Sequence, residues 1–367
     1  MNTKPLAILA AGGTGGHMFP AQALAEELLS RGWEVKLSTD FRGGRFTQNF
    51  PRAVKIETVP SATFFSKNGL ISKIKAPFLI LGGIFSTLKV FWKNRPSIVV
   101  GFGGYPTIPA LTASIFMNLP RIIHEQNGVL GKVNQLFSKK VNLVACGTWP
   151  TIMPEKIVSE HIGNPVRKEV MSRSGSPYIP PGNHPMSILI MGGSQGARVL
   201  SNIVPEAICS LPKELSNYIR VFQQAREEDC ERVRAYYSAN GIVCEVLPFF
   251  DNIASRLSEA QLIISRSGAS SVAEIGTVGR PSILIPLGSA IRDEQTLNAD
   301  PLKKLRAATI IAEKNFTVKR LNKAILKILS SPENASKMAI NAHKTVVLDA
   351  TKKLADRVEE ISGHSNR

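Results

Sequence analysis

Glycine-rich turns that follow short apolar runs are the segments of this chain best suited to chemistry. One turn, residues 12–17, follows the apolar residues 6–10, and another, residues 192–198, follows a run that ends at Met191. Glycine allows a sharp turn and lets a ligand approach the backbone closely. Where a helix follows, its free N–H groups and positive dipole end favour phosphate or another anion. Two such turns about half a chain apart predict two nucleotide-binding folds that face one cleft and hold a phosphate-bearing substrate.

The first turn matches neither of two common nucleotide motifs. Met18 stands where Gly-x-Gly-x-x-Gly requires its third glycine, and the Gly-Lys-Ser/Thr of a P-loop is absent. Hydride transfer and ATP hydrolysis are therefore not supported. His17 lies near the expected helix start, where the dipole disfavours protonation. A neutral imidazole beside a substrate hydroxyl is a candidate general base, and a histidine hydrogen-bonded to its own loop is the structural alternative.

Two later segments follow strand-like runs in the same half of the chain. Residues 101–106 (Gly-Phe-Gly-Gly-Tyr-Pro) form another glycine corner, and residues 124–127 (His-Glu-Gln-Asn) place four polar side chains after the next run. The carboxyl ends of strands are where α/β sheets bind ligands. A turn with side-chain caps is the alternative explanation for residues 124–127.

In the second half, residues 265–268 form a corner before a helical pattern. Ser271-x-x-Glu274 is a capping-box pattern, which would use Glu274 to satisfy a free helix N–H group. A carboxylate in a first helical turn can also bind vicinal ribose hydroxyls. No Asp-x-Asp pair occurs in the sequence, so no metal clamp for a diphosphate is expected. Helix ends and Arg167 would have to stabilise that charge.

Strand-like runs alternate with helical patterns along the chain, which predicts parallel βα units in an α/β fold. We expect two Rossmann-like domains facing a cleft. The N-terminal domain would span residues 1–164, with a turn or hinge at residues 163–167, and the C-terminal domain would span residues 165–345. A helix in residues 346–367 would pack on the second domain or cross back to the first. The expected strands are residues 6–10, 34–38, 97–101, 121–124, 143–146, 187–191, 218–222, 243–247, 262–265 and 282–286.

The composition restricts the class of protein. The 367 residues suffice for two cores, and 43% hydrophobic residues argue against global disorder. Four cysteines form no Cys-x-x-Cys pair, which favours a reduced, cytosolic setting over a disulfide scaffold. Neither a signal peptide nor a spanning helix is expected, since glycines interrupt the first apolar run and Lys89 ends the longest one.

The formal net charge of +17 favours an anionic partner. No acidic residue occurs between Glu57 and Glu125, where cations are interleaved with large apolar residues. This mixture is typical of a bilayer-surface element, and a solvated amphipathic helix pair is the alternative. Nucleic acid is not favoured, because no nucleic-acid motif accompanies the charge. The segment includes Lys67, Lys73, Lys75, Lys89, Lys93, Arg95, Phe64, Phe65, Phe78, Phe85, Phe91 and Trp92.

Six of these segments, in order along nearly the whole chain, resemble the MurG family. They are residues 12–17, 103–106, 124–127, 163–167, 192–197 and 265–274. The family consists of bacterial UDP-N-acetylglucosamine:lipid I N-acetylglucosaminyltransferases. The resemblance implies a GT-B glycosyltransferase, a hexosyltransferase of peptidoglycan synthesis and hence of cell shape and division. It also implies a peripheral protein on the cytoplasmic face of the inner membrane.

The resemblance further implies an N-terminal domain for the lipid-linked muramyl-pentapeptide acceptor and a C-terminal domain for the donor. His17 is the first candidate base and Glu125 the second, and no metal or other cofactor is expected. Gly103, Gly104 and Tyr105 would lie on the acceptor side. The expected contacts to UDP-N-acetylglucosamine are Thr14, Gly15, Gly16, Asn127, Arg167, Ser194, Phe250 (through its backbone, to uracil), Ala269, Ser270, Glu274 (to ribose) and Gln295.

One segment departs from the family pattern. Residues 288–295 lack the histidine that often precedes the glutamine, although Gln295 and the following Asn-Ala are present. Other cell-wall synthesis proteins are candidate partners. The alternatives are another UDP-sugar enzyme, such as a glycolipid synthase or a sugar epimerase, and a non-catalytic scaffold at the membrane surface.

Overall fold

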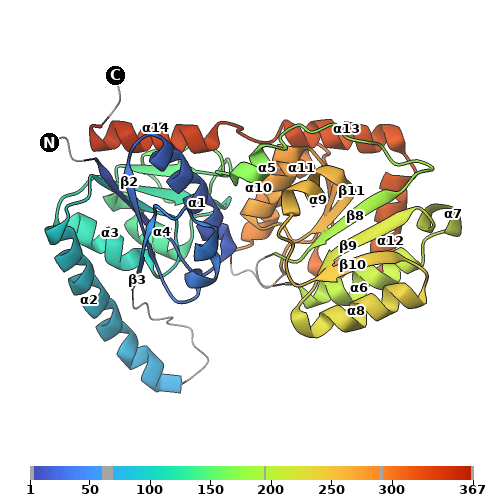
Figure 1. The fold of residues 1–367 in the computed structure, drawn as a ribbon, viewed down its shortest axis with the longest axis horizontal. Helices are drawn as coiled ribbons and strands as arrows, with labels where there is room; N and C mark the ends of the chain where they lie inside the picture. The colour runs from blue at the N-terminus through green and yellow to red at the C-terminus, as the bar shows by residue number, and fades with distance from the viewer. Residues whose placement is uncertain (1–3, 60–68, 194–195, 289–291, 365–367) are drawn as a thin grey trace. The chain divides into compact units, whose positions relative to one another are not determined.

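The computed structural model describes residues 4–59, 69–193, 196–288 and 292–364, which form two compact units (Figure 1). The first unit contains the described residues up to Arg167 and again from Val347 onward, and the second spans Lys168 to Val346. The domain boundaries predicted from the sequence lie after residues 164 and 345. Each unit is a parallel α/β sheet covered by helices, so the predicted fold class of two Rossmann-like domains is confirmed.

The first unit is built on a seven-stranded parallel sheet of order β3-β2-β1-β4-β5-β6-β7. Helices cover both faces of the sheet, which explains why its central strands are continuous apolar runs. The strands are β1 (Leu6–Ala10), β2 (Glu34–Thr39), β3 (Lys55–Thr58), β4 (Ile98–Gly101), β5 (Arg121–Glu125), β6 (Leu143–Cys146) and β7 (Ser159–His161). The helices are α1 (Gly15–Ser30), α2 (Gly69–Lys93), α3 (Thr107–Phe116), α4 (Lys132–Phe137) and α14 (Ala350–Ser362), with 3₁₀ turns η1 (Gly43–Asn49) and η2 (Ser138–Lys140).

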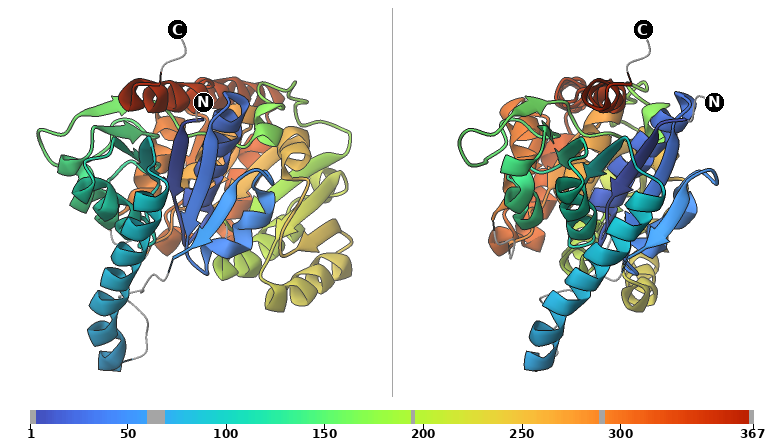
Figure 2. Two further views of the ribbon diagram at one scale, coloured as in Figure 1. Left: turned by 60° about the vertical axis from the view of Figure 1, so that its left-hand side comes forward. Right: turned by 90° about the vertical axis from the view of Figure 1, so that its left-hand side faces the viewer.

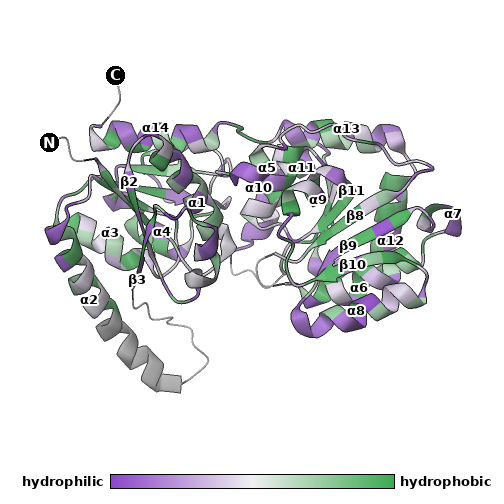
Figure 3. Ribbon diagram, in the orientation of Figure 1, coloured by the Kyte–Doolittle hydropathy of each residue, from purple (hydrophilic) through white to green (hydrophobic). Residues whose placement is uncertain are grey.

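The second unit has a six-stranded parallel sheet of order β10-β9-β8-β11-β12-β13. Figure 3 shows that β8 and β11 are largely hydrophobic. The strands are β8 (Met186–Met191), β9 (Ile219–Gln224), β10 (Val243–Leu247), β11 (Ala260–Ser265), β12 (Ser282–Leu284) and β13 (Ala308–Ile310). The helices are α5 (Lys168–Met171), α6 (Arg198–Cys209), α7 (Lys213–Ser216), α8 (Glu227–Ala239), α9 (Ile253–Glu259), α10 (Ala269–Val278), α11 (Glu294–Lys304), α12 (Val318–Leu329) and α13 (Pro332–His343), with the 3₁₀ turn η3 (Glu313–Asn315).

The C-terminal tail is divided between the units. Helix α13 belongs to the second unit, whereas α14 packs on α1 and buries Leu354, Ala355 and Val358 in the core of the first. Helix α2 packs along α3, and Figure 2 shows it extending well beyond the sheet of the first unit.

Candidate functional site

Two glycine corners lie against each other at the carboxyl ends of neighbouring strands β1 and β4. A Cβ atom added to Gly12 would lie 2.4 Å from Cγ of Pro106, and one added to Gly104 would lie 2.9 Å from the carbonyl oxygen of Gly12. Gly103 and Gly104 also have φ angles of +99° and +84°, which disfavour any residue with a side chain. Glycine is therefore required here because two backbone turns share one small space.

His17 lies where these corners meet. Its Nδ1 is 2.8 Å from the carbonyl oxygen of Gly12, so Nδ1–H is the donor, and Nε2 is the nitrogen that carries the lone pair in the neutral form of the ring. A Cβ atom added to Gly103 would lie 3.1 Å from Nε2, which places this nitrogen beside the second corner. The loop hydrogen bond that we considered as a structural alternative is thus present, and it also fixes the tautomer that a general base requires.

The start of α1 forms the other side of this corner. Helix α1 begins at Gly15 with Thr14 as N-cap, and the Thr14 hydroxyl makes no capping hydrogen bond within the described chain. Gly15 is buried, and Thr14 and Gly16 are half-buried. The first-turn N–H groups of a helix of 16 residues therefore follow directly on the glycine turn.

The carboxylate of Glu125 is surrounded by donors from its own loop. Its Oε1 accepts from the backbone N–H and the side-chain amide of Asn127, both at 3.0 Å. Its Oε2 accepts from the N–H of Gly131 at 2.7 Å and from Nδ2 of Asn134 at 2.8 Å. Both oxygens of this buried group are engaged, which favours a role in shaping residues 126–131 over a role as base.

His124 and Gln126 face away from solvent. His124 is completely buried, and burial lowers its pKa to about 4 despite a hydrogen bond to the carbonyl of Gly163. The ring donates from Nε2 to that carbonyl over 3.1 Å, and Nδ1 accepts from the amide of Gln126, also over 3.1 Å. The polar residues 124–127 were expected at the ligand-binding edge, but His124 and Gln126 are buried structural groups.

The remaining predicted residues of the first unit lie near this edge. Tyr105 is half-buried and packs against the core. The guanidinium carbon of Arg167 lies 4.3 Å from the ring centroid of Phe19, a residue of α1. Arg167 is therefore held beside the helix that follows the first glycine turn.

Sequence reasoning missed a third loop at this edge, after β2. The buried Asp40 accepts from the N–H of Gly43 at 2.9 Å and pairs with Arg42 at 3.0 Å. A Cβ atom added to Gly12 would lie 3.1 Å from Oδ1 of Asp40, and one added to Gly13 would lie 3.7 Å from Nη2 of Arg42. The signal was available as Asp-Phe-Arg-Gly-Gly directly after the strand-like residues 34–39.

In the second unit, the glycine turn after β8 is held by Gln224. Its Oε1 accepts from the N–H of Gly192 at 3.2 Å, and its Nε2 donates to the carbonyl of Pro248 at 3.0 Å. Gln224 thus connects this turn to the segment that contains the buried Phe250. Ser194 lies outside the described residues, and Gln224 was not foreseen from the sequence.

The capping-box alternative for Glu274 is wrong. Helix α10 begins at Ala269 with Gly268 as N-cap, so Glu274 is the sixth helical residue and lies beyond the first turn, not at the capping position. Glu274 and Ala269 are buried, and Ser267 Oγ and Ser270 Oγ have no hydrogen-bond partner among the described residues. These hydroxyl groups lie at the start of a 10-residue helix, where an anionic ligand is favoured.

Gln295 is near the start of α11. Its Oε1 accepts from the N–H of Leu287 at 3.0 Å, so its amide nitrogen is the group left to donate to a ligand. Three residues further along, Asn298 donates from Nδ2 to the carbonyl of Ser267 at 3.2 Å. This bond connects α11 to the corner before α10. Predicted donor contacts on both helices therefore belong to one region of the second unit.

In the segment between Glu57 and Glu125, which contains no acidic residue, α2 exposes large apolar side chains and a lysine on one face. Leu81, Phe85, Lys89 and Trp92 are exposed at intervals of four, four and three residues, which places them on one side of α2. Phe91 was counted with this surface, but it is buried in the core. The exposed Phe116 lies on α3, which packs against α2. Phe64, Phe65 and Lys67, and the side chains of residues 69–79, lie outside the described part.

None of the helices in the described part of the chain has the length and apolar content that a membrane span requires. Within the same ranges, no three His, Cys, Asp or Glu side chains gather where they could ligate a metal ion.

Two family models match the chain. The glycosyltransferase family 28 N-terminal domain matches residues 7–146, and the C-terminal domain of the same family matches residues 187–358. A UDP-N-acetylglucosamine--N-acetylmuramyl-(pentapeptide) pyrophosphoryl-undecaprenol N-acetylglucosamine transferase of Caulobacter vibrioides is 44% identical over 359 residues, covering 97% of this chain and 98% of its own. The enzyme of the same name from Rhizobium meliloti is 43% identical, covering 99% and 97%.

Solved structures agree with this assignment. The crystal structure of Acinetobacter baumannii MurG matches with a TM-score of 0.77 and 29% identity over 98% of this chain and all of its own. A UDP-GlcNAc 2-epimerase from Neisseria meningitidis bound to UDP-GlcNAc matches with a TM-score of 0.64 and 14% identity over 98% and 100%, a likeness of fold alone. The chain therefore belongs to glycosyltransferase family 28 and, within it, to the MurG family of N-acetylglucosaminyltransferases, which have the GT-B fold.

Proposed function

We propose that this chain transfers N-acetylglucosamine from UDP-N-acetylglucosamine to the C4 hydroxyl of lipid I, with inversion, to form lipid II for peptidoglycan synthesis. The observation that carries the proposal is the placement of His17. Its Nε2 lies beside the second glycine corner, while the bond from Nδ1 to Gly12 holds the ring in the accepting tautomer. Family membership supports the choice of donor and acceptor.

In the proposed step, Nε2 of His17 removes the proton from the C4 hydroxyl. The hydroxyl oxygen forms a bond to C1 of the donor sugar, and the bond between C1 and the diphosphate oxygen breaks. UDP leaves with the electron pair. Glu125 supports the acceptor side by shaping its loop through Asn127, Gly131 and Asn134. Gly103, Gly104 and Tyr105 form the neighbouring corner.

The proposed donor site uses the second unit together with contacts from the first. Ser194, Ala269 and Ser270 would contact the diphosphate at turns before helices, where N–H groups favour anions. Glu274 would accept from the ribose hydroxyls, the backbone of Phe250 would contact uracil, and Gln295 would donate to the sugar. Thr14, Gly15, Gly16, Asn127 and Arg167 are the proposed contacts from the first unit.

We also propose peripheral binding to an anionic membrane on its cytoplasmic face, through α2. Exposed Phe85 and Trp92 on the same face as Lys89 supply apolar groups and a cation to the headgroup region. Each nearby cation contributes about 1 kcal/mol at an anionic leaflet. Cell-wall synthesis proteins remain candidate partners at that surface.

The catalytic proposal is tested by UDP release and product formation with a short-chain lipid I analogue. UDP-glucose and UDP-N-acetylgalactosamine serve as competing donors. Loss of a general base lowers kcat by about 100- to 10,000-fold, so we expect this for His17→Asn. His184→Asn, in the loop before β8, is the matched control. Near-normal turnover of His17→Asn at saturating acceptor would refute the assignment of the base.

The same assay separates the alternative functions. A sugar epimerised in the absence of acceptor would favour an epimerase, and no UDP release with any acceptor would favour a scaffold. Flotation with phosphatidylglycerol vesicles tests the membrane surface: Phe85→Ser with Trp92→Ser should abolish binding. Ile340→Ser removes another exposed apolar side chain, from α13, and this variant should bind normally. Binding retained by the α2 variant would contradict the proposed membrane face.

A further inference from the structure

A buried arginine connects the carboxyl ends of three neighbouring strands in the second unit. Arg266 directly follows β11, and its Nη1 donates to the carbonyls of Ile285 at 3.2 Å and Pro286 at 3.3 Å, just after β12. The same nitrogen is 2.9 Å from Oε2 of Glu313, in the 3₁₀ turn that follows β13. The ion pair therefore fixes the edge of the sheet from which residues 286–288 leave.

Two successive backbone N–H groups of that segment are held by side chains. Gly288 donates to Oε2 of Glu313 at 2.8 Å, and Leu287 donates to Oε1 of Gln295 at 3.0 Å. Glu313 in η3 and Gln295 in α11 thus accept hydrogen bonds from the N–H groups of two adjacent residues. Any shift of Gly288 relative to Glu313 moves the N–H group that orients the amide of Gln295.

The Glu313 carboxylate is suited to this task because it remains charged. Burial alone would raise the pKa of Glu313, but hydrogen bonds from Arg266 and from the N–H of Gly288 outweigh burial and lower it. Hydrogen bonds to an ionised group are shorter and stronger than those between neutral groups. The pair therefore holds the segment more rigidly than a neutral side chain would.

We propose that Glu313 is a positioning residue for the donor sugar. Together with Arg266 it fixes residues 286–288, and these fix the amide of Gln295 with its nitrogen directed to the ligand. The inference rests on the proposed function, since Gln295 is there a sugar contact. Glu313 contributes to recognition of the sugar and not of the uridine diphosphate, which the α10 corner and Phe250 would bind.

The test compares Glu313→Ala and Glu313→Gln with wild type. Misplacement of a binding group by about 1 Å can cost roughly 100-fold, so we expect Glu313→Ala to raise the KM for UDP-N-acetylglucosamine by at least about tenfold. Glu313→Gln keeps an acceptor oxygen and should show a smaller rise. The Kd for UDP, measured by calorimetry, should stay within about twofold. Glu333→Ala, which removes an exposed glutamate paired with Lys337, is the matched control.

A double-mutant cycle with Gln295→Ala distinguishes positioning from a general structural role. If Glu313 acts through Gln295, the two substitutions together should raise KM little more than Gln295→Ala alone. Additive effects, equal losses of UDP and UDP-N-acetylglucosamine affinity, or an unchanged KM would each overturn the proposal. Should Glu313→Ala fail to fold, the cycle is made with Glu313→Gln.

Failure of the proposed function gives a different result. In that case wild type itself shows no transfer to the lipid I analogue. The role of Glu313 is then decided by the calorimetric Kd values for UDP-N-acetylglucosamine and UDP, which need no turnover. Loss of affinity for the sugar nucleotide alone supports the positioning role, and equal or absent losses refute it.

Discussion

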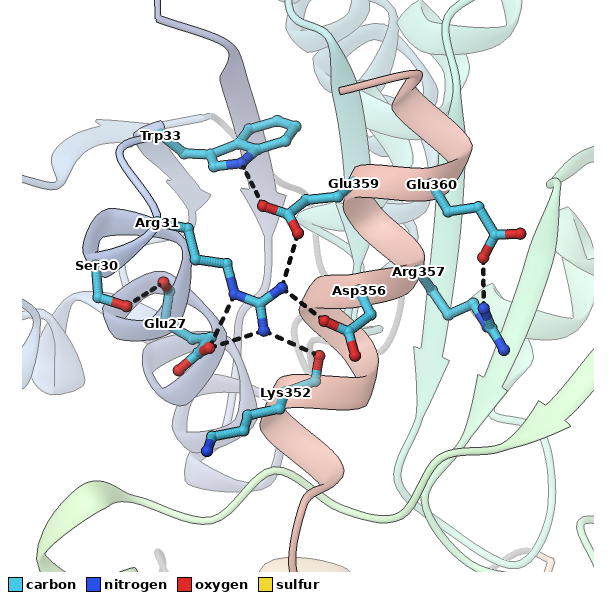
Figure 4. Close-up of polar contacts among 9 residues, drawn as sticks. All are labelled: Glu27, Ser30, Arg31, Trp33, Lys352, Asp356, Arg357, Glu359 and Glu360. Atoms are coloured by element: carbon cyan, nitrogen blue, oxygen red, sulfur yellow. Dashed lines mark hydrogen bonds and ion pairs between the residues drawn. The ribbon is translucent and has the colours of Figure 1, made fainter. Parts of the chain in front are cut away.

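Replacing Arg31 by methionine should loosen the C-terminal helix from the first unit. The guanidinium lies at the end of α1 and reaches three carboxylates (Figure 4): Glu27 at 2.8 Å, Asp356 at 2.7 Å and Glu359 at 2.8 Å. Burial alone would lower the pKa of Arg31, but these hydrogen bonds outweigh it and raise the pKa. Glu359 also accepts from the indole N–H of Trp33 at 3.3 Å.

The magnitude follows from the exposure of each partner. Arg31 and Glu359 are only 19% and 11% exposed, so this pair counts as largely buried. A hydrogen bond to a charged group contributes about 1.5–3 kcal/mol, and breaking a buried pair costs about 3–5 kcal/mol. Asp356 is 58% exposed, and an exposed pair contributes about 0–1 kcal/mol. We expect the opening of α14 to become easier by about 2–4 kcal/mol.

Hydrogen exchange measured by mass spectrometry reports this local opening without requiring two-state unfolding of both units. The protection of α14 amides should fall by about 30-fold to nearly 1000-fold, since 1.4 kcal/mol corresponds to tenfold. Arg357→Met is the matched control on the same helix. The side chains of Arg357 and Glu160, which form an ion pair, are 39% and 38% exposed, so opening of α14 should become easier by less than about 1 kcal/mol in this variant. Equal losses of protection in the two variants would refute the reasoning.

Two further predictions concern the first unit. Burial lowers the pKa of His124 to about 4 in the folded chain, so the unfolded chain binds a proton before the folded chain does as the pH falls. The free energy of unfolding should therefore be highest above about pH 6.5 and decrease by up to about 3 kcal/mol as the pH falls to 4. His124→Gln should remove that part of the slope in urea titrations at several pH values, and an unchanged slope would contradict the assignment. Gly104→Ala should destabilise the unit by about 1–3 kcal/mol and lower activity, because φ is +84° and the new Cβ would meet Gly12. Thermal melts and the transfer assay check this, and a stable, active variant would show that the corners are not tightly packed.

The sequence predicted the central strands and the five-residue edge strand β10, and it missed the three shorter edge strands. Strands β1, β6 and β10 have the expected bounds, since their apolar runs end at turn residues. The missed strands β3, β7 and β13 are edge strands of three or four residues. An edge strand of only three or four residues buries little surface, so its hydrophobic pattern is too short to recognise. For β7, the ion pair of Glu160 with Arg357 adds a contact between residues 197 positions apart, which no local pattern can reveal.

The candidate site was predictable in residue types but not in roles. The glycine corners and His17 were identified because glycine and imidazole have few other uses after a buried strand. The roles of Glu125 and Glu274 depended on which donors and which helix start lie nearby. For Glu274, a shift of the N-cap to Gly268 was enough to exclude the capping box. Phe91 and Trp92 are adjacent in sequence, and only the packing of α2 decides which of them is buried.

The buried His124, which does not reach the ligand-binding edge, has a structural task. His124 donates to the carbonyl of Gly163, and a Cβ atom added to Gly163 would lie 2.6 Å from Cβ of Val347 and 3.1 Å from Cβ of Ala350. Both connections to the second unit therefore leave the first unit at one place, next to the end of β5. Glu125 follows His124 directly and holds the loop at residues 126–131 through Asn127, Gly131 and Asn134. A completely buried histidine at the end of β5 therefore has a structural role: it fixes the strand end through Gly163, while the carboxylate of the next residue, Glu125, fixes the loop that follows.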